Sequence, residues 1–427
     1  MSKILIKNCN LISVDSKRPQ VEYNIDILIE NNKISNIQKN IKVKADKIID
    51  ATNQWVTPGF FNCHTHIPMS LFKEIVDGVK LQDWLTKHIW PLEAKMSKDD
   101  IYVFSLLGML ECIDNGVTTI NDMYFETGEI LKARDETGIN YVGGVTMMDV
   151  DGADAGEKRI QNNLAFVKSN KGYHAMLVHS FYTTSPKYLQ KVIKIGNELK
   201  NNLYHVHFCE NTQEVNDITK SYNVKHPTQI LEKYLKNKKI ILAHGVKLDD
   251  YDLKALGKLD ASISYNPISN MRLGCGFTNL KGLIQNKVNV CLGTDGDGSG
   301  SNLSILESMR LACLIPKAVN EDPTLITAYQ ALQMGTINGA KAIGLEKAKG
   351  SITVGKDADI NIFKFKNIQM FPINDPVSDI VYNANASDID TVIINGKIVK
   401  QNGKVSIVST ANVIKKAQVY LKKIKSL

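Results

Sequence analysis

The spacing of hydrophobic and polar residues changes along the chain and predicts two kinds of structure. Near both ends, apolar and polar residues alternate, as in half-buried strands. The alternating segments are 3–8, 26–30, 33–38, 359–363, 391–394 and 397–400. Asn31-Asn32 and Asn395-Gly396 are hairpin signals between neighbouring segments. We predict that both ends join into one small flanking domain, residues 1–57 and 348–427, with a helix over 411–424.

The middle of the chain alternates apolar runs of strand length with amphipathic stretches of helix length. The strand-like runs are 60–64, 118–122, 141–147, 175–179, 204–208, 240–244, 262–266 and 288–293. Strands that alternate with helices pair in parallel. Eight such units predict an α/β fold, a (β/α)₈ barrel over residues 58–347.

Composition and charge are those of an ordinary folded protein and narrow the choice of partners. Of the 427 residues, 43% are hydrophobic and 22% are charged, which excludes disordered and collagen-like classes. The net charge is +8, but only five of the 52 basic residues are arginine, and the lysines are spread along the whole chain. Nucleic-acid-binding proteins concentrate basic residues on one face or in one tract, so we expect no nucleic-acid partner.

Hydropathy and cysteine usage indicate a compartment. No apolar run approaches the roughly 20 residues of a membrane span, and the first residues lack the apolar core of a signal peptide. The seven cysteines are scattered and form no CxxC pair, which is typical of a reducing compartment. We therefore expect a cytoplasmic protein with no membrane partner.

Histidine and aspartate residues gather at the ends of the predicted barrel strands. His64 and His66 form His-Thr-His, and two residues so spaced in a strand face the same side. His207 and His244 end two further strand-like runs, and Asp295 follows a third. The carboxyl ends of barrel strands share one rim, where barrel active sites lie. These residues are therefore candidate ligands of one metal.

This donor set suits zinc, with ferrous iron as the alternative, and leaves room for a water molecule. A bound divalent metal lowers the pKa of that water toward neutrality. Glu210, three residues after His207, is then a candidate general acid–base. His205 is interpreted as a core histidine, with a role as partner of a ligand as the alternative.

Further candidates for substrate contact lie near the same rim. His179 ends another predicted strand, and Glu93 follows an aromatic-rich stretch that contains Trp84. Trp84 fits a pocket wall and a packing role equally well, because buried tryptophan is common in both places.

Taken together, these motifs resemble the amidohydrolase superfamily, and within it the methylthioadenosine/S-adenosylhomocysteine deaminases and chlorohydrolase-like (ATZ/TRZ) proteins. The similar segments are PGFFNCHTH (58–66), DWLTKHIWPLE (83–93), NDMYF (121–125), HVHFCE (205–210), AHGV (243–246), NPISNMRLG (266–274), LGTDG (292–296) and GSITVGKDADI (350–360). The resemblance implies a distorted (β/α)₈ barrel and a β-sandwich built from both termini.

The resemblance also implies roles for individual residues. It implies one divalent metal, held by His64, His66, His207 and Asp295. It implies that His244 hydrogen-bonds the attacking water, and that the substrate contacts are Glu93, His179 and Glu210. Binuclear relatives carry a bridging lysine on the fourth barrel strand, and the runs 141–147 and 175–179 contain none, which supports a single metal.

The chain departs from the family pattern in two places. Of the arginines that hold the carboxylate of S-adenosylhomocysteine, Arg134 matches one position, and no arginine stands near Val145, where the second would fall. The loop after Asp295, GDGSGSN (296–302), is richer in glycine than the family's Ser-Asn-Asn pattern. We therefore expect adenosines without the homocysteine tail to be the better substrates.

The function expected from the sequence is hydrolytic deamination of an adenine nucleoside by a zinc-dependent aminohydrolase. Its partner would be a small-molecule nucleoside, with a homo-oligomer left open. One alternative is hydrolysis of an s-triazine or another N-heterocycle at the same metal. The other is a metal-binding protein without catalysis, which would need neither Glu210 nor an open coordination position.

Overall fold

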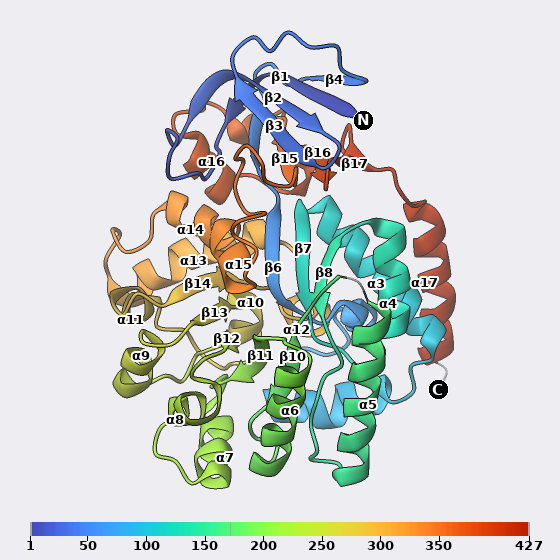
Figure 1. The fold of residues 1–427 in the computed structure, drawn as a ribbon, viewed down its shortest axis with the longest axis vertical. Coiled ribbons are helices and arrows are strands. Elements are labelled where there is room, and N and C mark those ends of the chain that lie inside the picture. Colours follow the sequence, from blue (N-terminus) through green and yellow to red (C-terminus); the bar gives the residue numbers. More distant parts are fainter. Residues whose placement is uncertain (1, 171, 426–427) are drawn as a thin grey trace.

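Strands from both ends of the chain share one nine-stranded sheet in the computed structural model, which describes residues 2–170 and 172–425 (Figure 1). Its strands are β1 (Lys3–Leu11), β2 (Glu22–Glu30), β3 (Lys33–Gln38), β4 (Lys47–Asp50), β5 (Trp55–Pro58), β15 (Ile360–Phe363), β16 (Ile389–Ile394), β17 (Lys397–Gln401) and β18 (Lys404–Val405). Strand β5 pairs with β1 on one side and with β15 on the other, so it joins the two ends of the chain.

This pairing corrects the expected architecture of the terminal strands. A sandwich needs two stacked sheets, whereas here the hydrogen-bonded order runs β18-β17-β16-β15-β5-β1-β2-β3, with β4 beside β1. The expected β-sandwich is therefore not confirmed. Alternating isoleucines from both ends, such as Ile4, Ile27 and Ile360, form one apolar cluster on this sheet. The domain division at residues 57/58 and 347/348 stays a prediction.

The strands expected in the middle of the chain are present. They are β6 (Phe60–Thr65), β7 (Val117–Asp122), β8 (Asn140–Gly143), β9 (Tyr173–His174), β10 (Met176–Ser180), β11 (Leu203–Phe208), β12 (Lys239–His244), β13 (Ala261–Tyr265) and β14 (Asn289–Leu292). Each pairs in parallel with its neighbour, as the alternation with helices predicts.

These strands form two parallel sheets, β6 to β9 and β10 to β14, and not a closed barrel within the described residues. At one seam the only ladder contact among those residues is the single bridge from Met147 to Val178, because β8 ends at Gly143. At the other seam the backbone N–H groups of Thr294 and Asp295 donate to the carbonyl of His64, at 3.2 and 3.0 Å. The α/β class is confirmed, and the barrel is interrupted at these seams.

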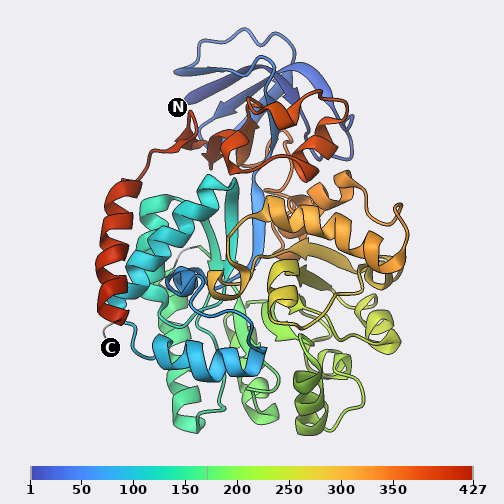
Figure 2. The ribbon, with the colours of Figure 1, turned by 180° about the vertical axis from the view of Figure 1, so that it is seen from behind.

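Helices surround the two parallel sheets (Figures 1 and 2). They are α1 (Leu81–Asp83), α2 (Trp90–Glu93), α3 (Lys98–Asp114), α4 (Thr127–Thr137), α5 (Ala153–Ser169), α6 (Pro186–Glu198), α7 (Thr212–Tyr222), α8 (Thr228–Ile230), α9 (Asp250–Leu256), α10 (Pro267–Arg272), α11 (Leu280–Gln285), α12 (Asp297–Gly300), α13 (Ile305–Asn320), α14 (Ala328–Met334), α15 (Ile337–Ala342), α16 (Pro376–Tyr382) and α17 (Thr410–Lys425). Shorter or irregular helical turns are η1 (Ile67–Phe72), η2 (Trp84–Ile89), η3 (Leu231–Leu235), η4 (Ile368–Met370) and η5 (Ala386–Asp388).

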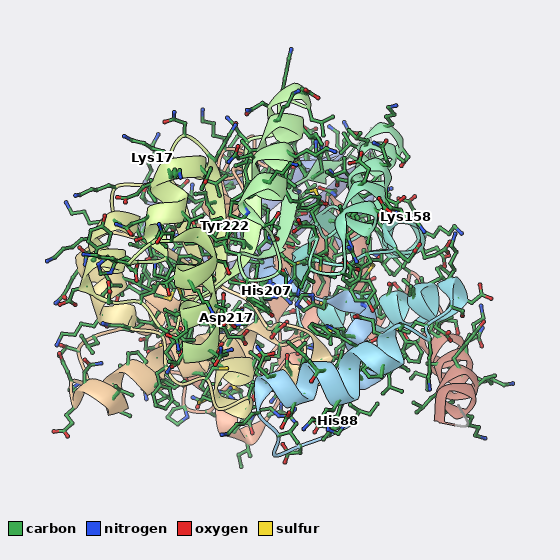
Figure 3. All side chains as sticks on the ribbon, turned by 90° about the horizontal axis from the view of Figure 1, so that it is seen from below. Lys17, His88, Lys158, His207, Asp217 and Tyr222 are labelled. Carbon is green, nitrogen blue, oxygen red and sulfur yellow. The ribbon has the colours of Figure 1, made fainter. Side chains whose placement is uncertain are left out.

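The C-terminal helix α17 lies along α3 and not against the terminal sheet (Figures 1 and 2). In the part of the chain that the structure describes, every helix is too short or too polar to cross a membrane. The carboxyl ends of the parallel strands point away from the terminal sheet (Figure 1), and Figure 3 views the molecule from that side, with His207 near the centre among the helices.

Candidate metal centre and active site

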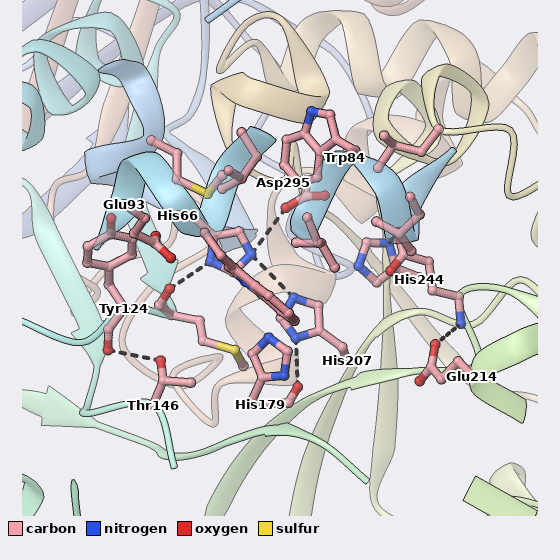
Figure 4. A pocket seen from close by; sticks show the side chains of 18 of the residues that line it. His66, Trp84, Glu93, Tyr124, Thr146, His179, His207, Glu214, His244 and Asp295 are labelled. Atoms are coloured by element: carbon pink, nitrogen blue, oxygen red, sulfur yellow. Dashed lines mark hydrogen bonds and ion pairs between the residues drawn. The ribbon is translucent and has the colours of Figure 1, made fainter. Parts of the chain in front are cut away.

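Four candidate ligands converge where strands β6, β11 and β14 end. The Nε2 atom of His66 lies 3.2 Å from Oδ1 of Asp295, and that of His64 lies 3.5 Å from the same oxygen. The Nε2 atoms of His207 and His66 are 3.2 Å apart (Figure 4). The structure thus brings together the residues that the sequence named as metal ligands.

The hydrogen bonds of the outer ring nitrogens show that these imidazoles suit a cation. Nδ1 of His66 donates to the carbonyl of Met123 at 2.7 Å, and Nδ1 of His207 donates to the carbonyl of His179 at 2.6 Å. A carbonyl only accepts, so in the neutral rings both Nε2 atoms carry lone pairs. Two lone pairs that face each other at 3.2 Å repel unless a positive charge lies between them. A proton on His66, whose pKa is raised, supplies that charge in the absence of a metal, and a divalent cation would take its place. Carbonyl-anchored Nδ1–H groups are also usual for metal-binding histidine.

The charge and the burial of Asp295 also suit a bound cation. Burial alone would raise its pKa, but hydrogen bonds and charge from His64 and His66 hold the pKa well below its usual range. Burial lowers the pKa of His66, yet the hydrogen bond and charge of Asp295 outweigh burial and raise it to about 9. His64 Nε2 is buried, and Oδ1 of Asp295, at 3.5 Å, is the oxygen that it faces. A divalent cation would meet one carboxylate and three imidazole nitrogens here, a donor set that suits zinc.

Two serines hold the other carboxylate oxygen of Asp295. Ser269 Oγ donates to Oδ2 at 2.6 Å, and Ser299 Oγ donates to it at 2.9 Å. Ser269 comes from the NPISN segment, and Ser299 comes from the glycine-rich loop that departs from the family pattern. The sequence analysis assigned no role to either serine, although it singled out both segments that carry them.

His64 is held from behind by His205. Nδ1 of His64 lies 2.9 Å from Nε2 of His205. The amide nitrogen of Asn121 donates to the carbonyl of Cys63 at 2.9 Å and lies 3.0 Å from Nδ1 of His205. His205 is fully buried, so it is a core histidine that also backs a ligand candidate. The two sequence interpretations of His205 therefore both describe it.

We expect His205→Leu to weaken zinc binding by about 10- to 100-fold, the range for loss of a group that orients a ligand. Without the second imidazole, Nδ1 of His64 loses its partner and the ring is free to turn. Competition with a chromogenic chelator measures the affinity, and activity at saturating zinc should largely return. His174→Leu, which changes a histidine outside the centre, is the matched control. Equal zinc affinity in the His205 variant and the wild type would contradict this role.

Glu210 and His244 lie beside the ligand cluster and supply acid–base groups. Oε1 of Glu210 is 3.6 Å from Nδ1 of His244. Burial first, and then the negative charge of Asp295, raise the pKa of the Glu210 carboxyl to about 8. Nδ1 of His244 donates to Oδ1 of Asn270 at 2.8 Å, and Nε2 of His244 is buried without a partner among the described atoms. Glu210 can thus donate a proton at neutral pH, and His244 can accept a hydrogen bond.

A cleft with about 740 Å³ of empty space, open solvent included, lies over these groups. Of the residues expected to contact substrate, Glu93, His179 and Trp84 line the cleft (Figure 4). Burial raises the pKa of Glu93, whereas burial first and then the charge of His66 lower the pKa of His179 to about 3. Trp84 is only 5% exposed, so it serves both as wall and as packing.

The cleft also has apolar and aromatic walls that sequence reasoning missed. They are Leu81, Leu85, Ile89, Tyr124, Phe125, Tyr182 and Leu273. Five of the seven lie in the motif segments 83–93, 121–125 and 266–274, but a motif does not show which of its side chains faces a cleft, because that depends on how separate segments pack. A planar apolar ring bound next to acid–base groups fits such a lining.

Arg134 is placed away from the cleft. It sits in the last turn of α4, where its guanidinium donates to Asp135 at 2.8 Å and to Asn170 at 2.8 Å. It is not among the residues that line the cleft. The expected contact between Arg134 and substrate is therefore not supported, because its donors are already used by Asp135 and Asn170. The sequence match rested on position along the chain, which does not report the direction of a side chain.

Arg159, in α5, is an arginine next to the cleft wall that the sequence analysis missed; like Arg134, it is not among the lining residues. Its guanidinium carbon lies 6.0 Å from the ring centre of Phe125, which lines the cleft. Its nitrogens donate to both carboxylate oxygens of Asp151, at 2.6 Å each, so the charge is partly balanced. Spacing within the sequence gave no signal for this placement.

Known proteins are similar in sequence to most of this chain. Residues 55–399 match the amidohydrolase family. A 5-methylthioadenosine/S-adenosylhomocysteine deaminase of Thermoanaerobacter pseudethanolicus is 38% identical over 418 residues, which is 96% of each chain. A 5′-deoxyadenosine deaminase of Methanobrevibacter smithii is 35% identical over 99% of this chain and 98% of its own.

The fold has close solved relatives as well. The crystal structure of an adenosine deaminase from Xanthomonas campestris with bound zinc superposes with a TM-score of 0.93, covers 100% of this chain and 99% of its own, and is 24% identical. The family match spans most of the chain and includes every strand of the two parallel sheets. The chain therefore belongs to the amidohydrolase family.

Proposed function

We propose that this protein is a metal-dependent hydrolytic deaminase that converts an adenine nucleoside and water into the inosine analogue and ammonia. The observation that carries the proposal is the convergence of His64, His66, His207 and Asp295 at the base of a cleft that is also lined by a buried Glu210, whose pKa is raised to about 8. The sequence relatives named as deaminases of 5-methylthioadenosine and 5′-deoxyadenosine support this substrate class.

The cofactor proposed is one divalent cation, zinc first and ferrous iron as the alternative, held by His64, His66, His207 and Asp295. When bound, such a cation supplies a water molecule of lowered pKa. The zinc reported for the solved adenosine deaminase supports this choice. All seven cysteines are free and buried, which supports the proposal of a reducing, cytoplasmic setting.

The residues of this chain then move three protons. Asp295, ionised because of its neighbours, takes a proton from the attacking water. Glu210 gives its proton to the ring nitrogen next to C6, so that the carbon becomes electrophilic. His244 accepts a hydrogen bond from the water through its free Nε2 and directs it at C6. Asp295 passes its proton to the amino group, the C6–N bond breaks, and ammonia leaves. The C6 hydroxyl then returns the second proton of the water to Glu210, which forms the C6 carbonyl and restores the acid.

A panel of substrates tests the proposal with the metal-replete enzyme. We expect ammonia release, and the absorbance shift from adenine to hypoxanthine, with 5′-methylthioadenosine, 5′-deoxyadenosine or adenosine. Reaction with none of these would overturn the proposal. Release of chloride or amine from a chloro- or alkylamino-s-triazine, with no reaction of the adenosines, would establish the alternative.

The position of Arg159 predicts how efficiently the enzyme acts on a substrate with a charged tail. We expect tail-free adenosines to have higher kcat/KM than S-adenosylhomocysteine, because Asp151 already occupies much of the Arg159 guanidinium. Arg159→Ala should lower kcat/KM for S-adenosylhomocysteine by about three- to tenfold, as for a partly exposed charge pair, and leave 5′-methylthioadenosine within about twofold. Arg134→Ala, the matched control in α4, should change neither substrate. A larger effect of Arg134→Ala would restore the sequence-based assignment.

A further inference from the structure

A second buried glutamate, Glu214, grips the backbone that carries Glu210. Its Oε2 accepts the backbone N–H of Glu210 at 2.7 Å, and its Oε1 accepts the backbone N–H of Cys209 at 3.0 Å. Glu214 is 1% exposed and lines the cleft. Both oxygens of one carboxylate are thus committed to the two peptide groups at the end of β11.

This contact differs from ordinary helix capping. Glu214 is the third residue of α7, and the side chain of Asn211 caps that helix by accepting the N–H of Glu214 at 2.9 Å. A glutamate at this position in a capping box reaches back to the N-cap N–H, as Asp252 reaches Asp249 at the start of α9. Glu214 instead reaches past its N-cap to the two residues before it. Its carboxylate therefore serves the strand end and not the helix.

The same two residues are held from the other side by the strand that carries His244. The carbonyl of Cys209 accepts the N–H groups of Val246 and Lys247, at 2.9 and 2.8 Å. Cys209 has φ of 53°, a left-handed conformation that a residue other than glycine adopts only when its surroundings impose it. The N–H of the Cys209–Glu210 peptide is bonded to Glu214, and its carbonyl is bonded to Val246 and Lys247. These bonds fix the orientation of the peptide, from which the Glu210 side chain extends toward His244.

We propose that Glu214 is a positioning residue for the deamination reaction, which fixes the Glu210 carboxyl against the reacting ring by clamping the backbone of Cys209 and Glu210. The inference rests on the proposed function, because it assigns to Glu214 the support of that reaction's acid. Glu214 makes no contact with the reacting atoms in this role and acts only through Glu210.

A second consequence follows from the charge of Glu214. Burial first, and then the charge of Glu210, raise the pKa of Glu214 to about 7. Repulsion between two carboxylates is mutual, so ionised Glu214 favours the protonated form of Glu210. The other titratable groups that act on Glu210 are Asp295, His66, His244 and Cys275, and these stay the same when Glu214 alone is changed.

Glu214→Gln tests the proposal in the full-length, zinc-loaded enzyme. The glutamine keeps one acceptor oxygen but turns an amide N–H₂ toward the second backbone N–H. We expect kcat for the best adenosine of the panel to fall about 10- to 100-fold, with KM within about twofold and unchanged bound zinc. Loss of the like charge should also move the alkaline limb of the kcat profile to lower pH. Glu214→Asp, which keeps the charge and shortens the reach, should lower kcat without moving that limb.

Asp252→Asn is the matched control, since Asp252 is also a buried carboxylate at the third position of a helix but makes its bonds to Asp249 and Thr228. It should lower the melting temperature and leave kcat and the pH profile unchanged. Wild-type kcat in either folded Glu214 variant overturns the positioning role, and so does a loss of bound zinc that accounts for the whole effect. Failure of the wild type to deaminate any adenosine would instead overturn the proposed function.

Discussion

Glu210→Gln should retain bound zinc and lose deamination by about 100- to 10,000-fold, the usual contribution of a positioned acid–base group. The amide has nearly the shape of the carboxyl and can still donate a hydrogen bond, but it cannot transfer a proton to the ring nitrogen. The measurement is kcat by ammonia release, together with zinc content per chain. Glu232→Gln, at a half-buried glutamate that accepts a hydrogen bond from Tyr251 outside the site, is the control and should match the wild type.

The dependence of activity on pH tests the role of Glu210 independently. Glu210 works as an acid while it is protonated, and burial and Asp295 raise its pKa to about 8. Activity of the wild type should therefore persist through neutrality and fall as the pH rises through that value. The alkaline limb should vanish from the residual activity of Glu210→Gln. Substantial activity of that variant, with zinc in place, would show that another group is the acid and that catalysis does not depend on Glu210.

Removal of the divalent cation should abolish activity, and zinc should restore it. The facing Nε2 atoms of His66 and His207, 3.2 Å apart, have no favourable neutral arrangement, so the cluster gains most from a cation. Dialysis against a chelator, followed by addition of zinc, ferrous iron or magnesium in separate samples, measures the dependence. We expect recovery with zinc or ferrous iron and none with magnesium, which prefers oxygen ligands.

Loss of the cation should also lower the melting temperature, because a ligand that binds only the folded state stabilises it by about 2.7 kcal/mol at 100 times its dissociation constant. His207→Ala removes one ligand and is the matched variant: zinc added to it should restore neither activity nor melting temperature. Full activity after exhaustive chelation, with no zinc detected, would contradict a metal-dependent reaction.

Periodicity in the sequence predicted the strands of the two parallel sheets because burial on both faces leaves an unbroken apolar run. The ends of those runs carry the candidate ligands, and parallel pairing brings such ends together, so strand spacing alone pointed to His64, His207 and Asp295. The interruption of the barrel and the single terminal sheet could not be predicted, for another reason. Both depend on which backbone groups pair at a seam, as at Met147 and Val178, and hydrophobic spacing does not report pairing partners.

Roles that depend on the direction of a side chain needed the tertiary structure. Arg134 and Arg159 have the same chemistry, but helix packing places the first against Asn170 and the second next to Phe125. In the sequence, Glu214 is one more acidic residue near the start of a helix. Only the fold of the turn at Cys209 shows that the Glu214 carboxylate binds the backbone of Glu210.

The sequence by itself determined the α/β class, the strand ends that carry the metal-ligand candidates, and the reaction class that those residue types favour. These follow from local spacing and from the chemistry of imidazole and carboxylate. The tertiary structure decided the open seams, the backing of His64 by His205, the raised pKa of Glu210 and the position of Arg159. Each of these depends on distances between segments remote in sequence, because burial, electrostatic coupling and hydrogen bonding act through space and not along the chain.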